Sequence, residues 1–134
     1  MTVAKKYHRF DDGLLLSLKY FHDKKSGNSL AAQIVLYARN HESPVGKWDA
    51  VQVTIEGVEE LCAKVNGNEF NSICCGVKFL KFGDFWCVDV DGNYPLGEDP
   101  ESLDDVRKYG HCYIIGKKIK TKTLRRTSDQ ATPE

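Results

Sequence analysis

Hydrophobic and polar residues alternate along several short segments of this chain, and a period of two is typical of β-strands that bury one face. The clearest case is residues 48–56, in which two valines and an isoleucine alternate with polar side chains. Residues 13–21 and 111–124 have the same character with less regularity. Residues 30–39 contain alanines that would allow a helix, but their β-branched and aromatic residues favour a strand. Strands are therefore predicted in all four segments.

Residues 76–92 place two apolar stretches on either side of Gly83 and Asp84, a dipeptide suited to the two-residue loop of a β-hairpin. Such a loop fixes the register, so pairing begins with Phe82 opposite Phe85 and continues outward along both strands. One face of this hairpin is apolar and is predicted to lie in the core: Val77, Phe79, Val88 and Val90.

The opposite face of the predicted hairpin has mixed character. It is partly apolar and ends in a pair of opposite charges: Leu80, Phe82, Phe85, Cys87, Lys78 and Asp89. A face of this kind suits either the edge of the core or a surface that contacts a partner.

Residues 57–65 fit two structures. A strand that starts after a bulge at Gly57 would alternate through Leu61, Ala63 and Val65. The spacing of an amphipathic helix is met by a different set, which the spacing alone favours: Val58, Leu61, Cys62 and Val65.

One helix is predicted late in the chain. Asp99 followed by Pro100 is a helix-start signal, with aspartate as the cap and proline in the first turn. Leu103 and Val106 then face the core, and Gly110 ends the helix. Together with six or seven short strands in an antiparallel sheet, this helix predicts an α+β fold that is mainly β.

Length and composition place the chain among ordinary soluble domains. It has 134 residues, of which 41% are hydrophobic and 28% charged, and we expect one domain over residues 1–124. Residues 1–12 are polar and are expected to lack order until Phe10. Residues 125–134 form a polar tail that is expected to be disordered.

Cysteine usage and hydropathy bear on the compartment. Five cysteines at irregular spacing argue against a disulfide framework and favour a reducing compartment. No apolar stretch approaches the roughly 18 residues that a membrane span needs, and the start of the chain lacks the apolar region of a secretory signal. A cytoplasmic location is therefore expected.

Charge is unevenly distributed although the net charge is zero. Residues 83–106 contain eight acidic and no basic residues, whereas residues 107–126 contain eight basic and no acidic residues. Solvated faces that partly neutralise each other are the ordinary interpretation of such blocks. The alternative interpretation is that the acidic block contacts a basic partner.

Catalytic and metal-binding motifs are not evident. The four histidines stand in or beside predicted loops, and neither Cys-x-x-Cys nor His-x-x-x-His occurs. Asp89-Val-Asp91-Gly-Asn93 resembles the start of a calcium loop, but Pro100 occupies the position where a bidentate glutamate belongs. No nucleophile elbow or phosphate loop is present. We therefore expect no enzymatic activity, no metal and no cofactor.

The basic block, residues 107–126, suggests nucleic acid as an alternative partner. Clustered Lys and Arg can bind phosphates, but bases also need exposed aromatic residues on which to stack. Residues 116–126 contain no aromatic residue, and the acidic block upstream would repel a polyanion. The sequence therefore argues against a nucleic-acid partner while leaving it as a minor alternative.

The order of elements resembles that of small immunity-type proteins encoded beside bacterial polymorphic or contact-dependent toxins. An early Phe10-Asp11-Asp12-Gly13 leads into a strand, a Trp precedes the strand that ends in Gly57-Val58, and a glycine-bearing hairpin ends in Val88-Asp89-Val90-Asp91. The late strand that contains Cys-Tyr-Ile-Ile-Gly completes the resemblance. It implies that residues 57–65 continue a sheet as a strand.

The same resemblance implies a non-enzymatic protein that binds and neutralises one cognate toxin, for which a nuclease with a basic cleft is one candidate. Another small interaction module, such as a phage or host-defence regulator, is the alternative. Charge complementarity with a basic cleft would draw on the acidic block. The predicted contact residues are Asp89, Asp91, Glu98, Asp99, Glu101, Asp104 and Asp105.

Overall fold

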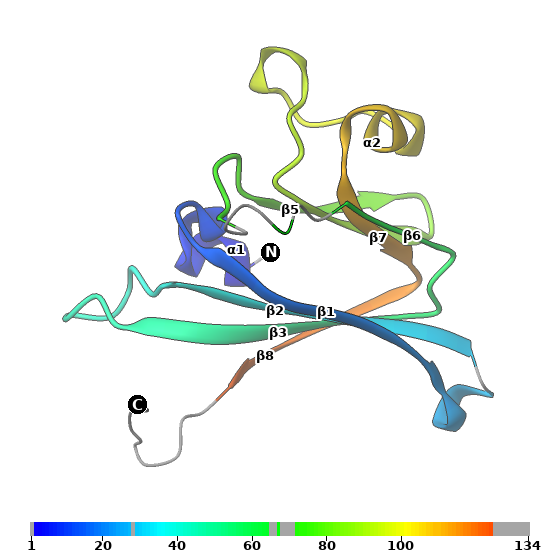
Figure 1. Ribbon diagram of the computed structural model, residues 1–134, viewed down its shortest axis with the longest axis horizontal. Coiled ribbons are helices and arrows are strands. Elements are labelled where there is room, and N and C mark those ends of the chain that lie inside the picture. Colours follow the sequence, from blue (N-terminus) through cyan, green and yellow to red (C-terminus); the bar gives the residue numbers. More distant parts are fainter. Residues whose placement is uncertain (1, 28, 65–66, 68–71, 125–134) are drawn as a thin grey trace.

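The computed structural model describes residues 2–27, 29–64, 67 and 72–124 and arranges them around two antiparallel sheets (Figure 1). Sheet A has the order β1 (Leu14–Asp23), β2 (Ser29–Arg39), β3 (Trp48–Glu56) and β8 (Lys118–Leu124). Sheet B has the order β4 (Glu60–Ala63), β7 (Cys112–Gly116), β6 (Phe85–Val90) and β5 (Val77–Phe82). The α-helices are α1 (Thr2–Lys6) and α2 (Leu103–Tyr109), and the 3₁₀ turns are η1 (His8–Phe10), η2 (Lys24–Ser26) and η3 (Pro95–Gly97).

The predicted class, α+β and mainly β, is confirmed, with one late helix. The described residues form eight strands in two sheets of four, where the sequence predicted six or seven strands in one sheet. The predicted tail, residues 125–134, lies outside the described residues. The division into two sheets arises because the chain leaves sheet A after β3 to form sheet B and returns to sheet A with β8.

The molecule is layered. The main hydrophobic cluster lies between the sheets and joins residues of sheet A, such as Ile34 and Val53, to Val88 and Ile114 of sheet B. A second cluster covers the other face of sheet B, where Val106 of α2 packs with neighbours from the sheet. Sheet B is therefore buried between sheet A and α2, whereas the face of sheet A that points away from sheet B is left uncovered by the described elements (Figure 1).

The predicted register of the β5–β6 hairpin is confirmed from Phe82 opposite Phe85 to Val77 opposite Val90. The face that was predicted to be core lies in the main cluster. The mixed face is packing rather than an open surface, because Leu103 and Val106 of α2 lie in the same cluster as its apolar side chains.

Residues 60–63 form a strand, so the helix that the spacing favoured is wrong and the strand implied by the resemblance is confirmed over these four residues, while residue 65 lies outside the described residues. Gly57 has a φ of 64°, a conformation that glycine adopts without strain, and it lets the chain turn out of β3. The segment then pairs with β7, where Glu60 lies opposite Ile115. Long-range pairing overrides a nine-residue pattern that could support only a marginal helix.

The N-terminal segment, predicted to lack order before Phe10, is folded over its described residues. Residues 2–6 form α1, and the Tyr7 side chain is 1% exposed. The Tyr7 hydroxyl donates a hydrogen bond to Oδ2 of Asp49 at 2.8 Å, and the Tyr7 ring stacks on Phe10. The expectation that this segment lacks order before Phe10 is wrong for the described residues, because an aromatic side chain here completes the main core.

Strand β1 departs from the expected alternation at a bulge. The pairing of β1 with β2 shifts between Leu15 and Ser17, so the extra residue, Leu16, points outward and is 53% exposed. Leu15 and Leu18 pack against the main cluster. Since β1 is an edge strand, the bulge also makes it a poorer template for another strand.

Candidate protein-binding surface

The seven acidic residues predicted as contacts do not form one surface, and Asp89 is the clearest exception. Its side chain is 0% exposed and lies under α2, where Oδ2 accepts a hydrogen bond from the Gly92 amide at 3.2 Å. Burial raises the pKa of this carboxyl, although the neighbouring Tyr94, His111 and Lys78 act in the opposite direction. Asp89 is therefore an interior carboxyl and not a contact residue in this conformation.

Replacing Asp89 by asparagine is expected to stabilise the protein at neutral pH. Tyr94 neighbours Asp89, but Oδ1 of Asp89 and the Tyr94 hydroxyl do not form a well-aligned hydrogen bond, and both atoms are buried. The buried charge of Asp89 is therefore poorly compensated, and a neutral asparagine would remove it. Because the pKa of Asp89 is raised in the folded state, its carboxyl destabilises the fold as pH rises through that pKa. The stability advantage of Asp89→Asn over the parent, measured by urea unfolding, should therefore shrink towards acidic pH. A less stable variant at neutral pH would show that the charged form is favoured.

The Asp91 side chain binds backbone amides of a neighbouring segment. It has a φ of 61°, and its Oδ1 accepts hydrogen bonds from the amides of Cys74 and Cys75. These bonds tie the segment before β5 to the end of β6. Since both bonds use the same oxygen, Asp91 acts as a structural clamp, and its carboxylate is only partly available to a partner.

Asp99 anchors the loop between β6 and α2. Its Oδ1 accepts from Nζ of Lys78 at 2.7 Å, and the Lys78 side chain is only 8% exposed whereas that of Asp99 is 64% exposed. A nearly buried ammonium needs a compensating charge. Asp99 therefore neutralises Lys78, the cross-strand neighbour of Asp89, and does not cap the helix as predicted.

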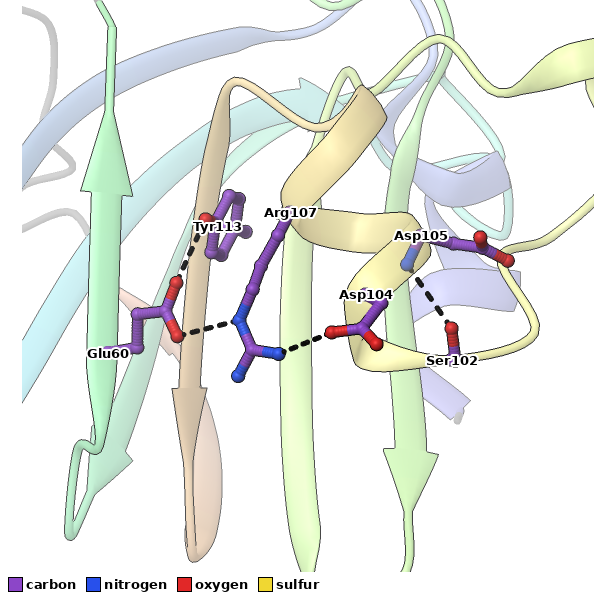
Figure 2. Close-up of polar contacts among 6 residues, drawn as sticks. All are labelled: Glu60, Ser102, Asp104, Asp105, Arg107 and Tyr113. Carbon is purple, nitrogen blue, oxygen red and sulfur yellow. Dashed lines mark hydrogen bonds and ion pairs between the residues drawn. The ribbon is translucent and has the colours of Figure 1, made fainter.

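The helix cap is Ser102. Its Oγ accepts from the Asp105 amide at 3.2 Å (Figure 2). Oδ2 of Asp105 accepts in turn from the Glu101 amide at 3.1 Å. This reciprocal arrangement is a variant of the capping box. The sequence signal was the Ser-x-x-Asp spacing of residues 102–105, which the Asp99–Pro100 start signal obscured.

A polar network attaches α2 to sheet B (Figure 2). Arg107 donates from Nε to Oε1 of Glu60 at 2.9 Å and from Nη1 to Oδ1 of Asp104 at 3.0 Å. The Tyr113 hydroxyl donates to Oε2 of Glu60 at 3.0 Å, and burial together with this bond raises the pKa of Tyr113 to about 12. The contacts of Arg107 are largely exposed, so they orient α2 more than they stabilise it.

The loop between β6 and α2 (yellow) projects at the top of Figure 1 beside α2. Its tip is apolar, because Leu96 is 94% exposed with a φ of 57°. The carboxylates of Glu98 and Glu101 are exposed beside it, with no hydrogen bond or ion pair in the described part of the chain. We call Leu96, Glu98, Glu101 and Asp104 the loop surface. Leu96 was missed because a single leucine beside Pro and Gly carries no periodic signal.

Comparisons of the chain with protein-family models, with curated proteins and with solved structures find no match. Among the described residues, no three His, Cys, Asp or Glu side chains gather closely enough to hold a metal ion. No helix in this part of the chain is long and apolar enough to cross a membrane. The five cysteines are free thiols.

Proposed function

We propose that this chain is a non-catalytic binding protein of the immunity type, which neutralises a cognate bacterial toxin by covering a basic surface of that toxin. The observation that carries the proposal is the loop surface, where an almost fully exposed leucine stands beside the carboxylates of Glu98 and Glu101, which form no ion pair with any described residue. Binding surfaces commonly combine an apolar anchor with a polar rim. A nuclease, whose cleft must attract a polyanion, is the kind of toxin that fits.

The base of the loop is held in place before any partner binds. The Lys78–Asp99 ion pair fixes one end, and the Ser102 cap with Asp105 fixes the other. A segment that is already ordered loses less conformational entropy on binding. The free carboxylates would accelerate the encounter with a basic partner through long-range attraction. The resemblance of the element order to immunity-type proteins supports the same role.

Reversing the charge of the loop surface is expected to slow association with the partner. The tagged chain is first used to co-purify a stoichiometric partner from the native host. Glu98→Lys combined with Glu101→Lys should then lower the association rate constant about tenfold at low salt and flatten its salt dependence. Stopped-flow or surface-based kinetics would measure both effects.

The matched control changes the net charge equally at exposed positions elsewhere, with Glu42→Lys and Glu59→Lys. The control should leave the salt dependence close to that of the parent. Equal kinetics for the loop variant and the parent would remove the loop surface as the contact. A co-purified partner without toxic activity would instead identify a phage or host-defence regulator that uses the same surface.

A further inference from the structure

The uncovered face of sheet A gathers residues that are far apart in the sequence. The register places Lys118, Lys120 and Lys122 of β8 opposite β3 residues whose side chains point away from sheet B. The β2 residues Tyr37 and Val35 share this face, because Ala38, Leu36 and Ile34 between them point into the main cluster. We call this the outer face. Its polar and larger apolar side chains include the following: Ser17, Lys19, Phe21, Asp23, Gln33, Val35, Tyr37, Arg39, Trp48, Gln52, Thr54, Glu56, Lys118, Lys120 and Lys122.

The outer face is basic. It contains four lysines and one arginine, and the carboxylates of β1 and β3 that point the same way are Asp23 and Glu56. Lys120 forms an ion pair with Glu56 at 2.8 Å. Lys19, Lys118 and Lys122 are exposed and take part in no salt bridge within the described part of the chain. With two carboxylates against five cationic side chains, the outer face keeps a net positive charge.

Lysines on an edge strand such as β8 often serve only to prevent strand pairing, and that role needs no aromatic neighbours. The outer face also contains aromatic side chains: Tyr37 and Trp48 form a ring pair with centroids 5.2 Å apart. Phe21 is 37% exposed, with Nζ of Lys19 lying 5.6 Å from its ring centroid. Three aromatic rings thus lie on the same side of one sheet as the lysines.

We propose that the outer face of sheet A is a binding surface for single-stranded nucleic acid. Aromatic side chains on an open sheet provide stacking platforms for unpaired bases, and lysines beside them bind the backbone phosphates. Successive lysines on the same side of β8 are about 7 Å apart, so they follow an extended strand rather than one phosphate. Sheet A separates this face from sheet B and α2, so the surface is distinct from the loop surface (Figure 1).

The proposal reverses the argument drawn from the basic block alone. That block contains no aromatic residue, but the sheet order β1-β2-β3-β8 brings Tyr37 and Trp48 beside it from some 70 or more positions earlier in the chain. The acidic block does not oppose binding here, because α2 and its loop lie beyond sheet B. The occupant is therefore a polyanion with exposed bases, and not merely an acidic surface.

The test is fluorescence anisotropy of the full chain with labelled single strands of about 12 nucleotides, as DNA and as RNA. Binding at low salt should weaken with a slope of log K against log salt of about −2 to −3, as three to four phosphate contacts require. Lys19→Glu with Lys122→Glu should weaken binding about tenfold or more, and Phe21→Ala about fivefold or more. Lys64→Glu with Lys108→Glu is the charge-matched control on the sheet B side and should change the affinity less than twofold.

Several results would overturn the proposal. Undetectable binding at low salt would show that the outer face does not bind single-stranded nucleic acid. An equal loss of affinity in the outer-face and control variants would show the same. Equal binding of polyglutamate would identify an acidic protein as the occupant. Salt-sensitive self-association in light scattering, abolished by Lys19→Glu with Lys122→Glu, would identify a second copy of this chain whose loop surface covers the outer face. A Phe21→Ala variant with parental affinity would show that no stacking occurs.

Discussion

Replacing Tyr7 by alanine is expected to cost about 3–5 kcal/mol of folding free energy, the usual range for removing a large buried aromatic side chain. The Tyr7 ring is 1% exposed, and it stacks on Phe10 at a centroid distance of 5.1 Å. Its loss would leave a cavity where α1 meets sheet A. A loss of this size is a large part of the stability of an ordinary domain, and urea unfolding monitored by tryptophan fluorescence would measure it.

The matched variant Tyr7→Phe separates packing from hydrogen bonding. It keeps the ring and removes only the hydroxyl that donates to Asp49. Oδ2 of Asp49 retains its bond from Nδ2 of Asn40 at 3.2 Å, so the expected loss is only about 1 kcal/mol. If Tyr7→Ala were as stable as Tyr7→Phe, the ring would contribute nothing, and α1 would not belong to the core.

The burial of Tyr7 shows why the N-terminal segment was predicted poorly. Its sequence is polar and has no period, and local composition was the only guide. The contacts that order it are long-range: Asp49 lies 42 positions away, and the His41 amide donates to the carbonyl oxygen of Lys6 at 3.1 Å. A single aromatic residue between charges gives no sign that a distant strand will cover it.

The β5–β6 hairpin was predictable in full because its information is local. A two-residue loop leaves one register, and the alternation of side chains then assigns both faces. The same register also indicated that Asp89 points into the protein, which the number of acidic residues in the block could not show. It placed Asp89 on the face of Phe85 and Cys87, which suits an interior position better than a place in an acidic contact surface.

The acidic block could not be divided into its roles from the sequence. Asp89 lies inside, Asp91 holds two amides, and Asp99 neutralises Lys78, whereas Glu98 and Glu101 are exposed. All are carboxylates in one short stretch of similar composition. Their roles depend on which face of sheet B α2 covers, and this is decided by residues outside the block.

The chain passes between the two sheets twice, after β3 and after β7, and Gly116 at the second crossing provides the second large effect. Gly116 ends β7, and after Lys117 the chain continues in sheet A as β8. A Cβ at residue 116 would overlap with Cγ2 of Ile55 and lie 3.0 Å from the carbonyl oxygen of Glu56. Ile55 is itself 0% exposed in the main core, so it has little room to move.

Gly116→Ala is therefore expected to destabilise the protein by about 1–3 kcal/mol through overpacking, even though alanine suits a strand better than glycine does. Gly67→Ala is the control, because a Cβ at residue 67 would meet no heavy atom of the described residues within 4 Å, and it should change stability by less than about 0.5 kcal/mol. The midpoint of urea unfolding should fall for Gly116→Ala with an unchanged slope. Equal midpoints for both variants would show that the structure around Gly116 accommodates the added methyl group without loss of stability. The close contact between Gly116 and Ile55 would then not be important for holding the two sheets together.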